Sequence, residues 1–194
     1  VFFPEQLEVT ADLDGAVGLS RDLVIAVPSA GFRPLVQRLA GRLQGGTRVC
    51  WATKGLDAHS GRLLHHVIDE VLGPVETAVI SGPSFAAEVA AGLPAAVTVA
   101  SATAAYAADL AERLHNARFR AYTSGDVVGV QLGGVVKNVL AIAAGIADGL
   151  GYGANTRAAL VTRGRAERTR RGSAMGGQRD TFAGLAGLGD LVLT

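Results

Sequence analysis

The sequence predicts an α/β protein in which a mostly parallel sheet domain is followed by an all-helical domain. Over the first 124 residues, apolar runs of strand length alternate with runs of helical periodicity. From Gly125 onward no run has convincing strand character, and helix-like stretches are separated only by glycines. We therefore expect one domain at residues 1–124 and a second at residues 125–194, with the boundary between Ser124 and Asp126.

The elements of the first part follow in order. Residues 22–28 (DLVIAVP) form a continuous apolar run that ends in proline, as a parallel strand buried on both faces would. Similar short runs predict further strands at 7–11, 95–101 and 119–124, and strands followed by loops within 48–55 and 76–85. Helical patterns between them predict helices at 32–43, 60–72, up to residue 91, and at 104–116. This alternation predicts a parallel sheet covered by helices.

The second part begins with an apolar run of helical length, residues 127–150, which contains Lys137. The run is long enough to cross a bilayer, but Gln131, Lys137, Asn138 and Asp148 favour the core helix of a globular protein. A lysine buried there must recover its lost hydration from a partner or an anionic ligand. The alternative is a lysine whose stem lies on the core while its ammonium group reaches water.

Composition narrows the class of function. The chain has 194 residues, is 49% hydrophobic and 18% charged, and carries a net charge of +1, which is typical of a globular protein without a nucleic-acid surface. Cys50 is the sole cysteine and the four histidines lack the spacing of a zinc pair, so we expect no disulfide and no metal site. The opening VFFPEQ has no signal-peptide pattern, and the cytoplasm is the expected location.

Three loops after predicted strands carry polar residues and glycine: residues 26–32, 51–56 and 80–88. Since ligands collect at the carboxyl ends of parallel strands, these loops place Lys54, Gly82 and Ser84 at one rim of the sheet. A cation with several small donors suits an anionic ligand. Asp190 lies in the glycine-flanked GLGDL segment, where a helix N-cap is an equally good interpretation, and Asn155 invites the same interpretation.

Taken together, the segments WATKGL, ISGPSFAAEVAAGLP, GVQLGGVVKNVLAIAAGIADGLGYGANTRAAL and GLAGLGDLVLT resemble bacterial NAD(P)-dependent glycerol-3-phosphate dehydrogenase. Their order and spacing are similar over essentially the whole chain. The resemblance implies that residues 1–124 are part of a Rossmann-like dinucleotide-binding domain and that residues 125–194 are part of a helical substrate domain. It implies reversible reduction of dihydroxyacetone phosphate by NADH or NADPH to sn-glycerol 3-phosphate for phospholipid synthesis, commonly by a homodimer.

The resemblance also implies roles for individual residues. Lys137 matches the proton acceptor of the family, and Lys54 matches a lysine near both nicotinamide and substrate. Asp190 matches an acidic residue of the substrate site, with a catalytic and a substrate-binding role. Further substrate contacts are implied for Gly82, Ser84, Asn138 and Thr194, and cofactor contacts for Phe32, Lys54 and Ala86.

Two segments that the family has are missing from this sequence. It contains no Gly-x-Gly-x-x-Gly turn, which receives the cofactor pyrophosphate, and no arginine-rich motif after GLGDLVLT. We therefore expect a fragment from the middle of an enzyme that is not active alone, and the preference between NADH and NADPH stays open. The alternatives are a non-catalytic truncated remnant and a related dehydrogenase of the 6-phosphogluconate or ketopantoate reductase type.

Overall fold

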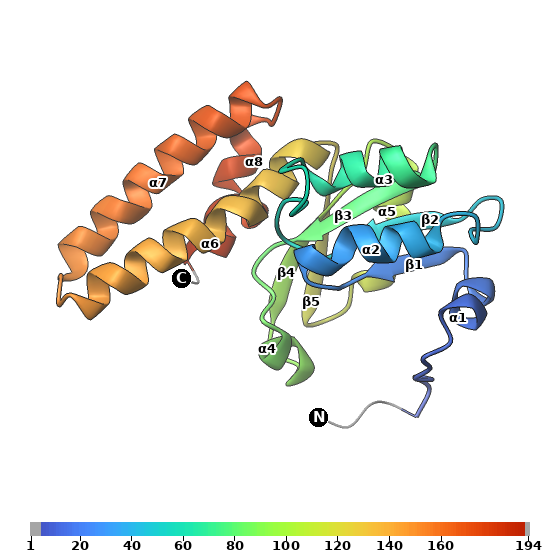
Figure 1. Cartoon of the computed structure of the whole chain (residues 1–194). Helices are drawn as coiled ribbons and strands as arrows, with labels where there is room; N and C mark the ends of the chain where they lie inside the picture. The colour runs from blue at the N-terminus through green and yellow to red at the C-terminus, as the bar shows by residue number, and fades with distance from the viewer. Residues whose placement is uncertain (1–4, 193–194) are drawn as a thin grey trace.

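A computed structural model describes residues 5–192 of the chain and shows a five-stranded sheet followed by a helical arm (Figure 1). The sheet part contains α1 (Leu13–Leu19), β1 (Asp22–Ile25), α2 (Ser29–Leu39), β2 (Arg48–Trp51), α3 (Leu64–Leu72), β3 (Glu76–Ser81), α4 (Ala86–Ala90), β4 (Ala95–Ala100), α5 (Ala104–Leu114) and β5 (Phe119–Ser124). The arm contains α6 (Val127–Gly149), α7 (Ala154–Ala174), α8 (Arg179–Ala183), the π-helical turn η1 (Leu185–Gly189) and α9 (Asp190–Val192).

The sheet has the strand order β1-β2-β3-β4-β5. The first three strands are parallel, and Ile25, Trp51 and Val79 lie side by side across them. β4 runs antiparallel to β3, and β5 runs parallel to β4. The predicted α/β class with a mostly parallel sheet and a following helical region is confirmed. Because β1, β2 and β3 share one direction, the loops that follow them meet at one edge of the sheet.

Helices cover both faces of the sheet (Figure 1). On one face α2 and α3 bury a core around the fully buried Trp51 and Phe32, whose rings meet edge to face with centroids 6.0 Å apart. On the other face α5 packs Tyr106 and Leu110 against Cys50 and neighbouring strand residues. Burial on both faces explains why the central strands read as continuous apolar runs rather than as alternating ones.

The arm begins at Asp126, which is 6% exposed and is the N-cap of α6. Its carboxylate accepts hydrogen bonds from the backbone N–H of Gly129 at 2.8 Å and of Gln178 at 2.7 Å, which ties α6 to the segment before α8. Within the described part of the chain, α6 is the one helix long and apolar enough to cross a membrane. Its first half is buried against the sheet part and η1, as the core-helix interpretation predicts, whereas Val139 and Ile142 in its second half are 65% and 64% exposed.

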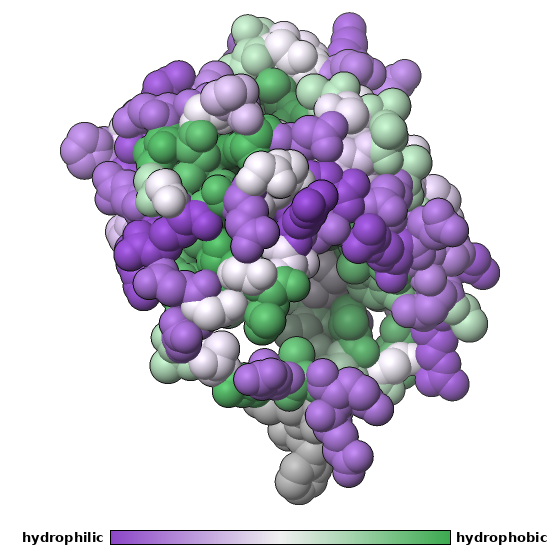
Figure 2. All heavy atoms as spheres, turned by 90° about the vertical axis from the view of Figure 1, so that its right-hand side faces the viewer, coloured by the Kyte–Doolittle hydropathy of each residue, from purple (hydrophilic) through white to green (hydrophobic). Residues whose placement is uncertain are grey.

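The prediction of a strand at residues 7–11 is wrong. This segment pairs with none of the five strands, and its apolar side chains are open to solvent, with Leu7 51% and Val9 71% exposed. β1 is an edge strand, and Val24 on it is 58% exposed. On the side where α1 and β1 lie, hydrophobic patches alternate with hydrophilic ones (Figure 2). An apolar pattern alone therefore did not create a strand, although within residues 5–192 one edge of β1 is unpaired.

Other predicted boundaries moved for local reasons. The strand at 22–28 ends at Ile25, and the helix at 60–72 begins only at Leu64. Ser60 is drawn into a turn, where its N–H and Oγ donate to the Asp57 carboxylate. The helix that follows Gly153 is capped by that glycine's backbone, so the N-cap interpretation of Asn155 is wrong.

One methyl group added at Gly133 of α6 is expected to have a large effect on the free energy of unfolding. A β-carbon there would lie far inside van der Waals contact of the Ala186 carbonyl oxygen in η1, so α6 and η1 can approach closely only without it. We expect Gly133→Ala to lower the free energy of unfolding by about 1–3 kcal/mol, the usual cost of overpacking. Gly145→Ala on the same helix meets nothing within 4 Å and is the matched control, with an expected gain of about 0.5–1 kcal/mol. Urea unfolding of both variants checks this, and equal effects would contradict it.

The lowered pKa of the Asp57 carboxyl is expected to make the fold less stable in acid. Its side chain is 3% exposed, and hydrogen bonds from Arg33 and then Ser60 lower the pKa of the carboxyl from 3.8 to about 2. Because the folded-state pKa is lower than the unfolded one, the stabilisation is present above pH 4 and is lost between pH 4 and pH 2. Unfolding of wild type and Asp57→Asn, compared from pH 7 downward, should differ by about 2 kcal/mol at neutral pH. A difference that stays constant down to pH 2 would refute this origin.

Candidate functional site

The site forms where the loops after β2 and β3 meet α6 and α9. Two glycines allow the backbone to pack tightly here. Gly55 has φ 136° and lies against Ser29, and Gly82 has φ 150°, so that a β-carbon would lie 2.9 Å from the Ala96 carbonyl oxygen. Both φ values lie in the range that only glycine adopts readily. The close packing places Lys54 and the Gly82 carbonyl beside each other, and Lys54 Nζ donates to that carbonyl at 3.1 Å.

The fully buried carboxylate of Asp190 is the centre of the site. Asp190 is the first residue of α9 and has 0% exposure. Its Oδ2 accepts from Lys54 Nζ at 2.6 Å and from Ser81 Oγ at 3.5 Å, while its Oδ1 lies 3.6 Å from Lys137 Nζ. Asp190 therefore forms ion pairs with two lysines from distant parts of the chain, instead of only capping a helix.

Lys137 extends from α6 toward this carboxylate. Its side chain is 12% exposed, and Nζ lies 5.0 Å from the centroid of the Phe85 ring, within the range of a cation–π contact. Lys54 is more open, at 28% exposure. Gly134 on α6 makes room for it, because a β-carbon there would lie 3.2 Å from Lys54 Cγ. The burial that the sequence predicted for Lys137 is thus compensated by an ion pair and an aromatic face.

Two ammonium groups and one carboxylate leave this cluster with a net positive charge. Asp190 Oδ1 has no hydrogen-bond partner, so Lys137 can approach it more closely or turn its protons elsewhere. In such a partly desolvated setting the field of two cations on an anion is stronger than in water. The arrangement can bind an anionic ligand at the rim of the sheet and can donate a proton from a lysine to an oxygen that gains charge.

The predicted site residues fall into two groups. Lys54, Lys137, Asp190 and Gly82 meet in one cluster, and Ser84 Oγ donates to the Gly82 carbonyl at 3.2 Å, in the same loop. Three others lie elsewhere. Asn138 is exposed on α6, about 100° around the helix from Lys137; Ala86 is exposed at the start of α4; and Phe32 is fully buried against Trp51. Thr194 lies outside the described residues. The roles of all of these remain predictions.

Sequence reasoning missed three residues that the structure places at the site. Ser81 contacts Asp190, Phe85 covers Lys137, and Gly134 makes room for Lys54. The sequence carries a further signal for the two lysines themselves. Lys54 and Lys137 are the only lysines of the chain, and every other Lys or Arg position among the 18 is arginine. Arginine does not exchange its proton near neutral pH, so the two lysines are the side chains of this group that suit proton transfer.

Other chemistry is not apparent in the described part of the chain. Residues 5–192 contain no group of three or more His, Cys, Asp or Glu side chains placed to hold a metal ion. Burial raises the pKa of the Cys50 thiol to about 11, which keeps it a neutral, inert core residue at physiological pH.

Comparison with known proteins identifies the family. Residues 1–107 match the model of the NAD-dependent glycerol-3-phosphate dehydrogenase N-terminus, and residues 126–194 match that of the C-terminus. The chain is 59% identical over 193 residues to a glycerol-3-phosphate dehydrogenase [NAD(P)+] of Nitrosococcus oceani, with 99% of this chain and 56% of that protein covered. For the protein of the same name from Thioalkalivibrio sulfidiphilus the values are 58% identity, 99% and 58%.

A solved structure agrees with the sequence matches. The crystal structure of glycerol-3-phosphate dehydrogenase from Coxiella burnetii superposes with a TM-score of 0.95 at 52% identity and covers 98% of this chain and 58% of that one. The chain therefore spans somewhat more than half the length of the relatives it matches. The family predicted from the sequence motifs is confirmed: the chain belongs to the NAD-dependent glycerol-3-phosphate dehydrogenase family.

Proposed function

We propose that the protein to which these residues belong interconverts dihydroxyacetone phosphate and sn-glycerol 3-phosphate with NAD(H) or NADP(H), and so supplies glycerol phosphate for phospholipid synthesis. One observation carries the proposal. The only two lysines of the sequence converge on one buried carboxylate at the edge of the sheet where β1, β2 and β3 end. The names of the relatives support the choice of substrate and cofactor.

Each charged group has a distinct task in this proposal. During reduction the ketone oxygen of the substrate gains negative charge, and the Lys137 ammonium donates the proton that converts it to a hydroxyl. In the opposite direction the neutral amine accepts that proton. Lys54, which is the more exposed of the two, adds positive charge beside the substrate. Asp190 has no exposure, so it acts by holding both lysines in place rather than by touching the substrate.

The residues present fit the nicotinamide end of a dinucleotide cofactor. The edge beyond β1, β2 and β3 is formed by the turns at Gly55 and Gly82 and carries the partly exposed Lys54. Lys54 and the loop from Gly82 to the start of α4, which includes Ala86, would hold the nicotinamide end. When bound, the cofactor supplies or accepts the hydride. The preference for NADH or NADPH is left to measurement.

A cytoplasmic location and a homodimer are parts of the same proposal. The apolar helix α6 supports the first, because it carries Lys137 in an ion pair with Asp190 and buries its first half in the protein. The homodimer is what the family resemblance implies, and light scattering of the full-length protein tests it. No contact with nucleic acid or membrane is part of the proposal.

The experiment is a substrate comparison on the purified full-length protein. NADH or NADPH oxidation would be followed at 340 nm with dihydroxyacetone phosphate, and ketopantoate would be offered under the same conditions. Oxidation of 6-phosphogluconate by NAD or NADP tests the other related enzyme. We expect turnover with dihydroxyacetone phosphate alone. Turnover with one of the other substrates instead would overturn the assignment, and no turnover with any would favour a remnant without catalysis.

A further inference from the structure

Arg168 on α7 is a buried cation that the proposed mechanism does not use. It is 1% exposed, and its guanidinium turns inward toward the segment that precedes Asp190. Nη1 donates to the Gly187 carbonyl at 3.1 Å and Nη2 donates to the Phe182 carbonyl at 3.0 Å. No carboxylate among residues 5–192 lies within ion-pair distance of it, and its Nε has no hydrogen-bond partner.

A charge in this position is costly. Burial, and then the charge of Arg165, lower the pKa of the Arg168 guanidinium, whereas the charge of Asp190 acts in the opposite direction. Arginine nevertheless keeps its proton in proteins, so the structure accommodates a desolvated cation held mainly by two backbone carbonyls. An apolar side chain would fill the same space without that cost. The function of Arg168 is therefore expected to depend on the two carbonyls that it binds.

Those carbonyls lie in α8 and in the turn η1, the two elements that lead the chain to Asp190. Phe182, whose carbonyl accepts from Arg168, lies in α8 shortly before η1. Gly187 lies within η1, and the five residues of η1 lead directly into Asp190. A π-helical turn has weaker intrinsic geometry than an α-helix and often occurs at functional sites. On its other side η1 is in tight backbone contact with Gly133 of α6. Arg168 thus contacts η1 from α7, in addition to the contact that η1 makes with α6.

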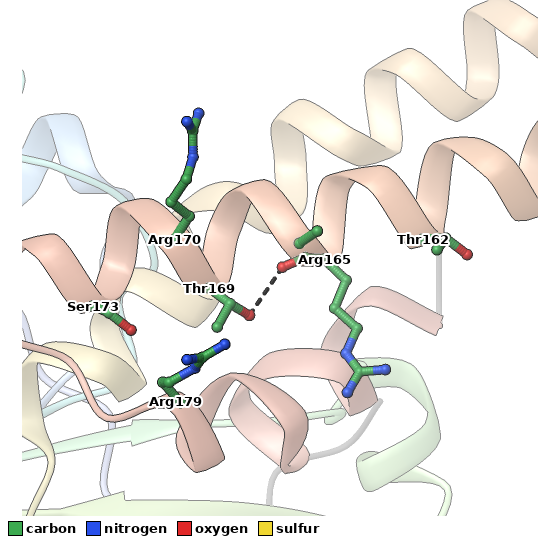
Figure 3. A pocket seen from close by; sticks show the side chains of 7 residues that line it. Thr162, Arg165, Thr169, Arg170, Ser173 and Arg179 are labelled. Atoms are coloured by element: carbon green, nitrogen blue, oxygen red, sulfur yellow. Dashed lines mark hydrogen bonds between the residues drawn. The ribbon is translucent and has the colours of Figure 1, made fainter.

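The neighbouring arginines have a different setting. Arg165, Arg170 and Arg179 line a surface pocket of about 710 Å³ between α7 and α8. In Figure 3 Arg170 projects from α7 away from Arg179, and it pairs with Glu167 on the same helix. Its side chain is 75% exposed. Arg170 therefore provides a control that shares the helix and the side-chain type but not the contact with η1.

We propose that Arg168 is a positioning residue that fixes η1, and through it the Asp190 carboxylate, against Lys54 and Lys137. The kinetic part of this inference rests on the proposed function, whereas its structural part does not. If the hydrogen bonds from Arg168 to the Gly187 and Phe182 carbonyls are lost, Asp190 moves relative to the lysines. Proton transfer at Lys137 then slows although both lysines remain. A misplacement of about 1 Å at a catalytic site can cost on the order of a hundredfold in rate.

The test compares Arg168→Met, Arg168→Lys and Arg170→Met in the full-length protein. Methionine keeps the length without the charge, and lysine restores a cation that can reach one carbonyl. We expect Arg168→Met to lower kcat for dihydroxyacetone phosphate by about tenfold to a hundredfold per folded molecule, with the KM for the cofactor changed by less than about twofold. Arg168→Lys should recover part of kcat, and Arg170→Met should behave as wild type.

Amide hydrogen exchange gives a readout that needs no activity. In Arg168→Met the amides of residues 185–191 should exchange at least about tenfold faster than in wild type, while those of β2 and β3 stay unchanged. Faster exchange with an inactive wild type would sustain the positioning role and reject the proposed function. Unchanged exchange and unchanged kcat would overturn the inference. A uniform rise in exchange over the whole protein, with normal kcat in the folded fraction, would also overturn it. Should Arg168→Met fail to fold, the same comparison made on Arg168→Lys decides.

Discussion

Lys137→Ala in the full-length protein should lower kcat for dihydroxyacetone phosphate by about 10²- to 10⁴-fold, the usual contribution of a general acid or base. The variant removes the only amine of α6, which contacts Asp190 Oδ1 and the Phe85 ring. The fold should survive, because Lys54 still neutralises Asp190 through its 2.6 Å hydrogen bond. Steady-state kinetics combined with circular dichroism measures both quantities.

The controls separate charge from proton transfer. Lys137→Arg keeps a cation beside Asp190 but cannot exchange a proton near neutral pH, so it should be nearly as slow as the alanine variant. Lys54→Arg, at the more exposed position, should retain more activity, because that role is mainly electrostatic. Full turnover by Lys137→Ala would remove the assignment of this residue as the proton donor.

Asp190→Asn has the second large expected effect, on stability as well as on activity. The carboxylate is completely buried, and its loss leaves two lysines without a counter-charge. Removing one partner of a buried ion pair typically costs about 3–5 kcal/mol. Lys54 and Lys137 are 28% and 12% exposed, so each can turn partly to water, and we expect the lower end of that range. Urea unfolding of the variant gives the value.

A double variant tests whether this cost arises from unpaired charge. Asp190→Asn combined with Lys54→Met removes one cation along with the carboxylate, so the pair should cost less than the sum of the two single changes. Asp180→Asn, on α8 in the same arm, is the exposed control and should change stability by less than about 0.5 kcal/mol. Strict additivity of the two site changes would show that Asp190 and Lys54 are not energetically coupled.

Much of the fold could be predicted because burial leaves a direct trace in the sequence. The strand-then-loop segments at 48–55 and 76–85 contain β2 and β3, the run at 119–124 coincides with β5, and the apolar run from Val127 is α6. The direction of β4 could not be predicted, since an antiparallel strand buried on both faces reads like a parallel one. The wrong prediction of a strand at 7–11 shows a second limit: an apolar run of strand length does not by itself pair with an available sheet edge.

The charged residues of the site could be predicted from the sequence, but the elements that position them could not. Lys137 and Lys54 stand out as cations in or beside buried segments, and the motifs pointed to Asp190. The turn η1 and the guanidinium of Arg168 have no such trace, because the basic stretch around Arg168 resembles a solvated helix face. Only the packing of α7 on α8 shows that Arg168 points inward while Arg170 points outward.

The scarcity of lysine gives the site an intrinsic spectroscopic handle. Reductive methylation with ¹³C-formaldehyde attaches labelled methyl groups to amines, and within this sequence the only side chains that can take them are Lys54 and Lys137. The two amines share one carboxylate but differ in exposure, so their resonances should be distinct. An arginine-rich surface therefore leaves ligand binding and proton movement visible by NMR with almost no background from the rest of these residues.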